Sequence, residues 1–385
     1  MAGASRYLRG ATTAPNATVI FEDPAPPETA SFLAPIFFQC SLIPYLLFLY
    51  FLGFRDNGVP GLANFGFQFL LLFVVATAVA GAVARALFDS SLANVDWIHG
   101  SAESLLTISN ILIVIGFQNA ISGQNVSMRT GVLISFVATL LLGAFVIYGV
   151  STGFEEHDQF LWGIGNVNQE LPWTVRTEPE NALSIATWTI HFMSVVEYIV
   201  AMNLVWKFAD ATSNPRWKGL TWGMLPNHAS SICAVTHHFF HNNNDLLFLV
   251  TAQAFFTMLG STTTMVAAFR LAKSNGWTFR SQEGTSEPSD RHLRRLQEPT
   301  NNIVLLTKVL CFTVMLSCIV KYGELAVYFP GTPNVAVAVT IVTGIPLVVA
   351  LFYLRLSFAE YSGSSEEAQR LTNSSEHLKN NGTFS

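Results

Sequence analysis

Charged residues are scarce in this sequence. Asp, Glu, Lys and Arg make up only 12% of its 385 residues, while 51% are hydrophobic and the mean hydropathy is +0.41. A soluble domain carries about 25% charged residues, so this composition excludes one ordinary soluble domain. The sequence predicts instead an all-α, polytopic integral membrane protein. We expect membrane lipid as its surroundings and no nucleic acid as a partner.

Cysteine is scarce as well. The chain has four, and all of them fall inside apolar runs, where cysteine packs as a small hydrophobic residue. They form no recognisable disulfide framework and indicate no redox compartment.

Long apolar runs dominate what is present. A helix needs about 20 residues to cross the hydrocarbon core of a bilayer, and nine runs are long enough, so we expect about nine transmembrane helices. These runs are residues 33–54, 64–88, 97–118, 130–150, 183–208, 219–240, 246–271, 302–328 and 335–355.

Composition shifts divide the chain further. The first 20 residues are rich in Ala and Thr and carry only Arg among charged residues, as organelle targeting segments do. The end of the chain is rich in Ser, Asn and Glu, which favours disorder. We predict a disordered lead with a targeting role open (1–32), an N-terminal bundle of four helices (33–150), a lumenal loop (151–182), a second bundle of three helices (183–271), a stromal linker (272–301), a C-terminal helix pair (302–356) and a disordered tail (357–385).

The chain also shows a weak internal match between its first three and its fifth to seventh apolar runs. Residues 41–45 align with 194–198, and Asp96 and Glu103 align with Asp245 and Gln253. Chance similarity between apolar segments is the alternative. A real match predicts two related three-helix repeats joined by one helix (3+1+3), plus two C-terminal helices. Parallel repeats of this kind occur in transporters that bind substrate between their halves.

Basic residues predict the orientation. If the N-terminus lies on side A, that side holds five of the 20 basic residues and side B holds fifteen. Cytoplasmic or stromal loops carry the excess of Lys and Arg, so we expect the N-terminus on the lumenal or exoplasmic side and the C-terminus on the stromal or cytoplasmic side.

Ionisable side chains inside the apolar runs predict a functional site. His99 and Glu103 are four residues apart and share a helical face. At about 1.5 Å per residue, most of the buried ionisable groups fall near side A. Such groups are costly in lipid and mark sites by default. The candidates for solute or ion binding are His191, Glu197, His99, Glu103, Gln253 and Asp245, and those for metal binding are His237, His238 and His241.

The chemistry of these residues leaves alternatives open. His237 and His241 are four apart, a spacing that can hold one transition-metal ion, with His191 and either Glu197 or Asp245 completing the shell. Imidazoles also ligate haem. Proton or substrate handling is another use of the same groups. The structural alternative is that the imidazoles face lumenal water or cap a helix end.

The sequence resembles known families at two places. Residues 182–184, 188–191, 197–198, 214–226 and 237–242 resemble the ycf-forty-nine-like membrane protein family of cyanobacteria and plastids, over about residues 181–276. Residues 36–118 resemble a second uncharacterised membrane family of the same organisms. The resemblance implies a plastid membrane, either thylakoid or inner envelope, and photosynthetic membrane complexes as partners. It implies no activity and transfers no catalytic residue.

Three functions therefore remain in view, and whether the protein is an enzyme stays open. The first is binding or transport of a small solute or ion through a lumen-side His/Glu pocket. The second is a metal- or cofactor-dependent membrane enzyme that acts on a lipid, pigment or quinone. The third is an assembly or scaffold factor for photosynthetic complexes.

Overall fold

The computed structural model describes residues 27–124, 126–165, 178–179, 181–278, 301–326 and 333–381. In these residues it contains nine α-helices and no strand, which confirms the all-α prediction. Eight of the described helices are long and apolar enough to span a membrane, so the chain is a multi-pass membrane protein. The predicted lead (1–32) and stromal linker (272–301) lie largely outside the described residues, and the predicted lumenal loop (151–182) does so over 166–177 and at 180.

The helices follow the predicted apolar runs closely, because each run is bounded by polar or turn-forming residues. α6 is the one described helix whose composition falls short of a spanning segment, since it carries several His, Asn, Ser and Thr residues. The helices are α1 Pro27–Leu52, α2 Gly61–Phe88, α3 Asp96–Ser122, α4 Met128–Thr152, α5 Ile185–Ala211, α6 Lys218–Phe239, α7 Phe248–Ser274, α8 Asn302–Ala326 and α9 Val335–Asn381.

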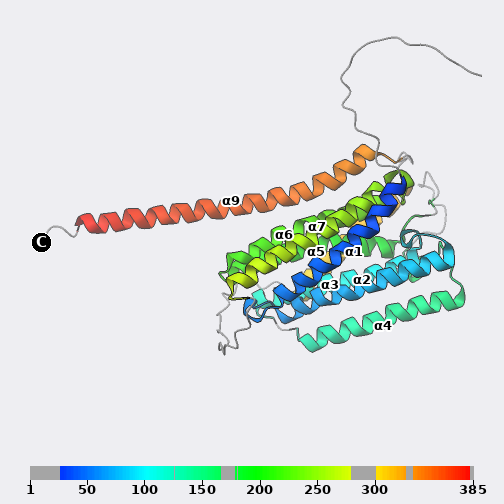
Figure 1. The fold of residues 1–385 in the computed structure, drawn as a ribbon, viewed down its shortest axis with the longest axis horizontal. Coiled ribbons are helices and arrows are strands. Elements are labelled where there is room, and N and C mark those ends of the chain that lie inside the picture. Colours follow the sequence, from blue (N-terminus) through cyan, green and yellow to red (C-terminus); the bar gives the residue numbers. More distant parts are fainter. Residues whose placement is uncertain are drawn as a thin grey trace, which may run out of the picture.

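α5 packs between α3 and α6, and the helices of the bundle lie side by side with α4 at one edge (Figure 1). α2 packs on α3, α1 on α7, α7 on α6 and α8 on α5, while α9 runs along α6. In the apolar segment of α3, 61% of residues are buried, against 11% in α4 and in α9. Those two outer helices therefore present most of their surface to lipid, and α3 presents little.

Two helix pairs are held close by glycine. A Cβ atom at Gly116 of α3 would overlap Ala63 of α2, and one at Gly223 of α6 would lie 2.9 Å from the carbonyl oxygen of Thr263 in α7. Membrane helices approach closely where small residues replace bulky ones. The α2–α3 and α6–α7 pairs are therefore closely packed units on either side of α5.

Two helix boundaries differ from the sequence prediction. α1 begins at Pro27, inside the segment 1–32 that was predicted to be disordered; proline is tolerated there because the first turn does not use its missing N–H. α9 continues to Asn381 and projects beyond the bundle, where disorder was expected from residue 357 (Figure 1). The segment between Gly363 and Gly382 has no glycine or proline and is rich in residues with high helix propensity.

Candidate functional site

Three histidines from three central helices meet at one end of the bundle. His99 lies in the first turn of α3, His191 in the second turn of α5, and His238 is the penultimate residue of α6. The ring centroids are 5.0 Å apart for His99 and His191, 4.9 Å for His99 and His238, and 4.6 Å for His191 and His238. Each side chain is buried. We call these three residues the histidine cluster.

Asp96 fixes the start of α3 against the start of α5. One of its carboxylate oxygens accepts a hydrogen bond from the backbone N–H of Phe160 at 2.8 Å, and the other accepts one from Ser184 at 3.1 Å. Ser184 is also the N-cap of α5, because its hydroxyl accepts the N–H of Thr187 at 3.2 Å. His99 and His191 are thereby held at the same depth.

A sharp turn fixes the end of α6 against the start of α3. His241 and Asn242 adopt left-handed backbone angles, with φ of 53° and 57°, so the helix stops at Phe239. The side-chain amide of Asn242 then donates to the carbonyl oxygen of Ala93 at 2.8 Å and to the side chain of Asn94 at 2.9 Å. These contacts bring the His238 ring to His99.

Helix α8 supports the same end of the bundle. The ammonium group of Lys321, 3% exposed, donates to the carbonyl oxygen of Leu183 at 2.6 Å and forms an ion pair with Glu178. Glu324, one turn further along α8, has a carboxylate oxygen 3.9 Å from the Nε2 atom of His241. Both interactions tie α8 to the segments that position α5 and end α6.

The ring nitrogens of the histidine cluster are poorly satisfied. Nδ1 of His99, Nε2 of His191 and Nδ1 of His238 are buried and have no hydrogen-bond partner among the described residues. Glu103 is the nearest acid, with Oε1 3.8 Å from Nε2 of His99. A buried polar atom without a partner costs about 1–3 kcal/mol. Three such atoms in one place indicate a site that a ligand completes.

The histidine cluster also has the geometry of a metal site. One ring nitrogen from each residue can be chosen so that all three lie within 4.8 Å of one another. Tetrahedral zinc with Zn–N bonds of about 2.0–2.1 Å needs nitrogens about 3.4 Å apart. Three nitrogens 4.8 Å apart would each move at most about 0.8 Å toward the ion to reach that tetrahedral spacing.

The structure uses the histidines at the end of α6 differently from the sequence prediction. Because α6 ends at Phe239, His237 and His241 do not share a helical face, and the expected pair at spacing four is not formed. His237 is buried, but its ring centroid lies 6.2 Å from that of His238. His241 instead lies near Glu324 of α8. His238 is the residue of this group that joins His99 and His191.

The other predicted site residues are spread more widely. Glu197 is 1% exposed and neither of its carboxylate oxygens has a partner in the described part of the chain, but it lies six residues, or about 9 Å, along α5 from His191. Asp245 is exposed in the turn Asn244–Leu246 and lies outside the buried cluster. Gln253 is half-buried on α7, where its backbone carbonyl oxygen accepts a hydrogen bond from the hydroxyl of Ser230 at 2.9 Å.

Two features escaped the sequence analysis. Asp96 was given no role in the predicted site, although an acid at the first position of a helix is a signal for an anchoring role at its N-terminus. A groove of about 300 Å³ between α3, α4 and α5 had no sequence signal, because apolar side chains line most of it. Ser104 and Ile190, next in sequence to Glu103 and His191, belong to its wall.

Comparisons with known proteins match both halves of the bundle. A family described as "Protein of unknown function (DUF3593)" matches residues 34–122, and one described as "Protein of unknown function (DUF2499)" matches residues 182–270. A protein of Synechocystis sp. called "Ycf49-like protein" is 43% identical over 108 residues, which cover 28% of this chain and 97% of the relative. No solved structure matches. His99 lies in the first matched region and His191 and His238 in the second, so the histidine cluster needs both.

Proposed function

The chain belongs to the Ycf49-like family, and from its histidine cluster we propose that it binds a divalent transition-metal ion inside the membrane. The family match supplies no activity, so the proposal rests on the site itself. The observation that carries it is the convergence of three buried imidazoles from three different helices, each with a ring nitrogen that has no hydrogen-bond partner among the described residues.

The donor set favours a particular class of ion. Neutral imidazole suits zinc, copper, iron and nickel, whereas magnesium and calcium prefer oxygen ligands. Three protein ligands leave one tetrahedral position open for water or a substrate, as in catalytic rather than structural zinc sites. Glu103 has a carboxylate oxygen 3.8 Å from Nε2 of His99, beyond hydrogen-bond distance, and a small movement would let it orient that imidazole as carboxylates commonly do for ligating histidines.

The helix packing supports a site that lies between two related halves. α1 packs on α7 as α5 packs on α3, and α2 packs on α3 as α6 packs on α7. In the predicted 3+1+3 repeat, α1, α2 and α3 correspond to α5, α6 and α7, and α4 links the two units. The matched helix contacts are those that such a repeat predicts. In transporters with parallel repeats the ligand lies between the halves, and the same location here favours an ion that the protein binds reversibly or moves.

A second candidate function is a metal-dependent enzyme that acts on an apolar molecule of the bilayer, such as a lipid, pigment or quinone. The groove between α3, α4 and α5 favours it, since its mostly apolar wall suits such a molecule, although none of the three cluster histidines lines that wall. The described residues form no comparable feature that favours an assembly factor, so a scaffold role serves as a contrary outcome of the test.

The distribution of basic residues supports an orientation in the membrane, and the cyanobacterial relative supports a type of membrane. The end of the bundle with the histidine cluster carries Arg85 and Lys321, while the opposite end carries most of the other basic residues in the described helices and their short connections. By the positive-inside rule the histidine cluster would lie on the lumenal or exoplasmic side. The relative in a cyanobacterium supports a plastid membrane, either the thylakoid or the inner envelope.

Cobalt binding tests the proposed function directly. The purified protein, stripped with a chelator, should bind about one equivalent of Co²⁺ with the intense visible absorption of four-coordinate cobalt. His99→Ala, His191→Ala and His238→Ala should each lower the affinity at least about a hundredfold, since second-shell losses alone reach that size.

His237→Ala is the matched control, because His237 is buried beside His238 but lies outside the cluster. It should keep wild-type binding. The proposal fails if the wild type binds no metal, or if His237→Ala loses as much affinity as the cluster variants. A scaffold role would instead show undiminished co-purification with photosynthetic complexes in all four variants.

A further inference from the structure

A second groove lies between α6 and α7 at the end of the bundle opposite the histidine cluster. Its volume is about 420 Å³ and its walls include Arg216, Trp222, Val266 and Arg270. We propose that this groove binds an anionic membrane lipid, with the head group at the two arginines and the start of an acyl chain along the seam between the helices.

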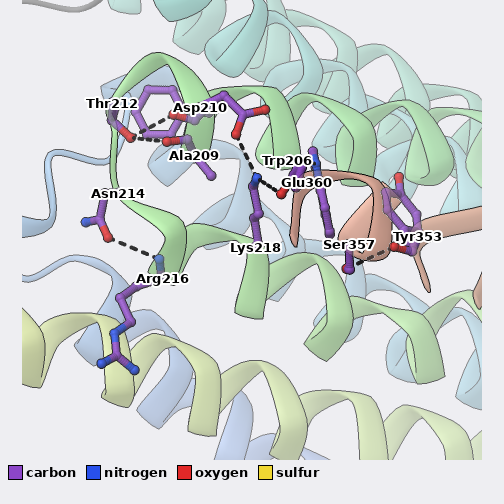
Figure 2. A network of polar contacts seen from close by, with 11 residues as sticks. Trp206, Ala209, Asp210, Thr212, Asn214, Arg216, Lys218, Tyr353, Ser357 and Glu360 are labelled. Atoms are coloured by element: carbon purple, nitrogen blue, oxygen red, sulfur yellow. Dashed lines mark hydrogen bonds and ion pairs between the residues drawn. The ribbon is translucent and has the colours of Figure 1, made fainter. Parts of the chain in front are cut away.

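The two arginines carry uncompensated positive charge. Neither guanidinium forms an ion pair with any described residue. The nearby acids are already engaged, because Lys218 pairs with Asp210 at 2.7 Å and with Glu360 at 2.5 Å. Figure 2 shows the Arg216 side chain directed away from that network, toward the yellow-green ribbon of α7. An anionic ligand would therefore complement the positive charge at this end of the groove.

The shape of the groove fits an elongated ligand. Its α7 wall extends from Thr262 to Arg270, a rise of about 12 Å. Gly219 leaves the groove open, since a Cβ atom added there would meet nothing within 4 Å. Deeper in, the hydroxyl of Thr263 donates to the carbonyl oxygen of Gly223 at 2.7 Å and holds the two helices together.

The chemistry along the groove selects a lipid over a free anion. Arginine binds phosphate with two parallel hydrogen bonds, and the arginines lie at the end of the bundle that carries most basic residues. Tryptophan concentrates at the level of lipid head groups, and Trp222 lines the groove beside Val266. A small inorganic anion would leave this apolar part of the groove unfilled, whereas an acyl chain covers it.

Titration followed by native mass spectrometry tests the site. The detergent-purified protein is titrated with phosphatidylglycerol or with zwitterionic phosphatidylcholine. Each cation near a membrane surface contributes about fivefold to binding of an anionic lipid, so Arg216→Gln with Arg270→Gln should weaken phosphatidylglycerol binding about twenty-five-fold. Arg129→Gln, which removes an exposed cation at the start of α4 on the same end of the bundle, should leave it unchanged.

A second variant separates the groove from general surface charge. Gly219→Leu keeps both arginines but fills the groove, and it should lower phosphatidylglycerol binding at least about tenfold while cobalt binding at the histidine cluster is retained as evidence of folding. Equal binding of the two lipids would overturn the proposal. So would a Gly219→Leu variant with wild-type lipid binding, or displacement of the lipid by inorganic phosphate alone.

Discussion

Zinc should stabilise this protein against unfolding, and the stabilisation should depend on His191. Under the proposed function zinc binds the folded cluster and finds no preformed site in the unfolded chain, so zinc at one hundred times its dissociation constant should add about 2.7 kcal/mol to the free energy of unfolding. For a large domain this corresponds to a rise of about 5 °C in the Tm. The estimate requires that the nitrogens of the histidine cluster, within 4.8 Å of one another, close around the ion without a change of fold.

His191→Gln is the most informative perturbation for this effect. Nε2 of His191 makes no hydrogen bond to a described residue, so its replacement by a side chain of similar size removes no contact of that nitrogen. The Tm of the metal-free variant should stay within about 2–3 °C of the wild type, since changes without such losses are usually small. The zinc-induced rise should disappear.

Thermal unfolding in detergent, with chelator or with zinc, measures both quantities in one experiment. His237→Gln controls for the loss of a buried histidine outside the cluster, and it should keep the full zinc response. If His191→Gln lowers the metal-free Tm strongly yet still responds to zinc, the imidazole is a packing residue and the metal site lies elsewhere.

Three further changes probe the fold that holds the site. Gly116→Val should destabilise by about 2–3 kcal/mol because the added side chain meets α2, whereas Gly143→Ala, which meets nothing within 4 Å, should be neutral in the same thermal assay. Asp96→Asn should cost about 1–3 kcal/mol and weaken cobalt binding, since it sets an amide against two backbone N–H groups. Lys218 lies outside the eight spanning segments. Burial lowers its pKa, but the hydrogen bonds and charges of Asp210 and Glu360 raise the pKa overall above its ordinary value. Its ion pairs should therefore persist through neutral pH and be lost only as pH rises through the raised pKa, which is measured as Tm against pH. Lys218→Met should lower the free energy of unfolding by about 1 kcal/mol or less.

The sequence alone determined the class of the protein and the depth of its polar groups. The lengths of the apolar runs decide how many helices can cross a bilayer, because nothing else satisfies the backbone in lipid. A rise of about 1.5 Å per residue then fixes how far His99, His191 and His238 lie from a helix end. The depth of a residue along a helix axis depends only on its position within that helix, so the sequence of one segment is enough to predict it.

Only the tertiary structure decided which polar groups meet. Neighbouring helical residues point about 100° apart, so whether His237 or His238 faces His99 and His191 depends on the rotation of α6. The packing of α6 on α5 and α7 and the left-handed turn after Phe239 set that rotation together. The same turn leaves Asp245 in solvent, although its position in the sequence is close to the cluster. Rotation about a helix axis has no strong signal in segments that are apolar on nearly every side, and it is settled by contacts between residues far apart in the chain.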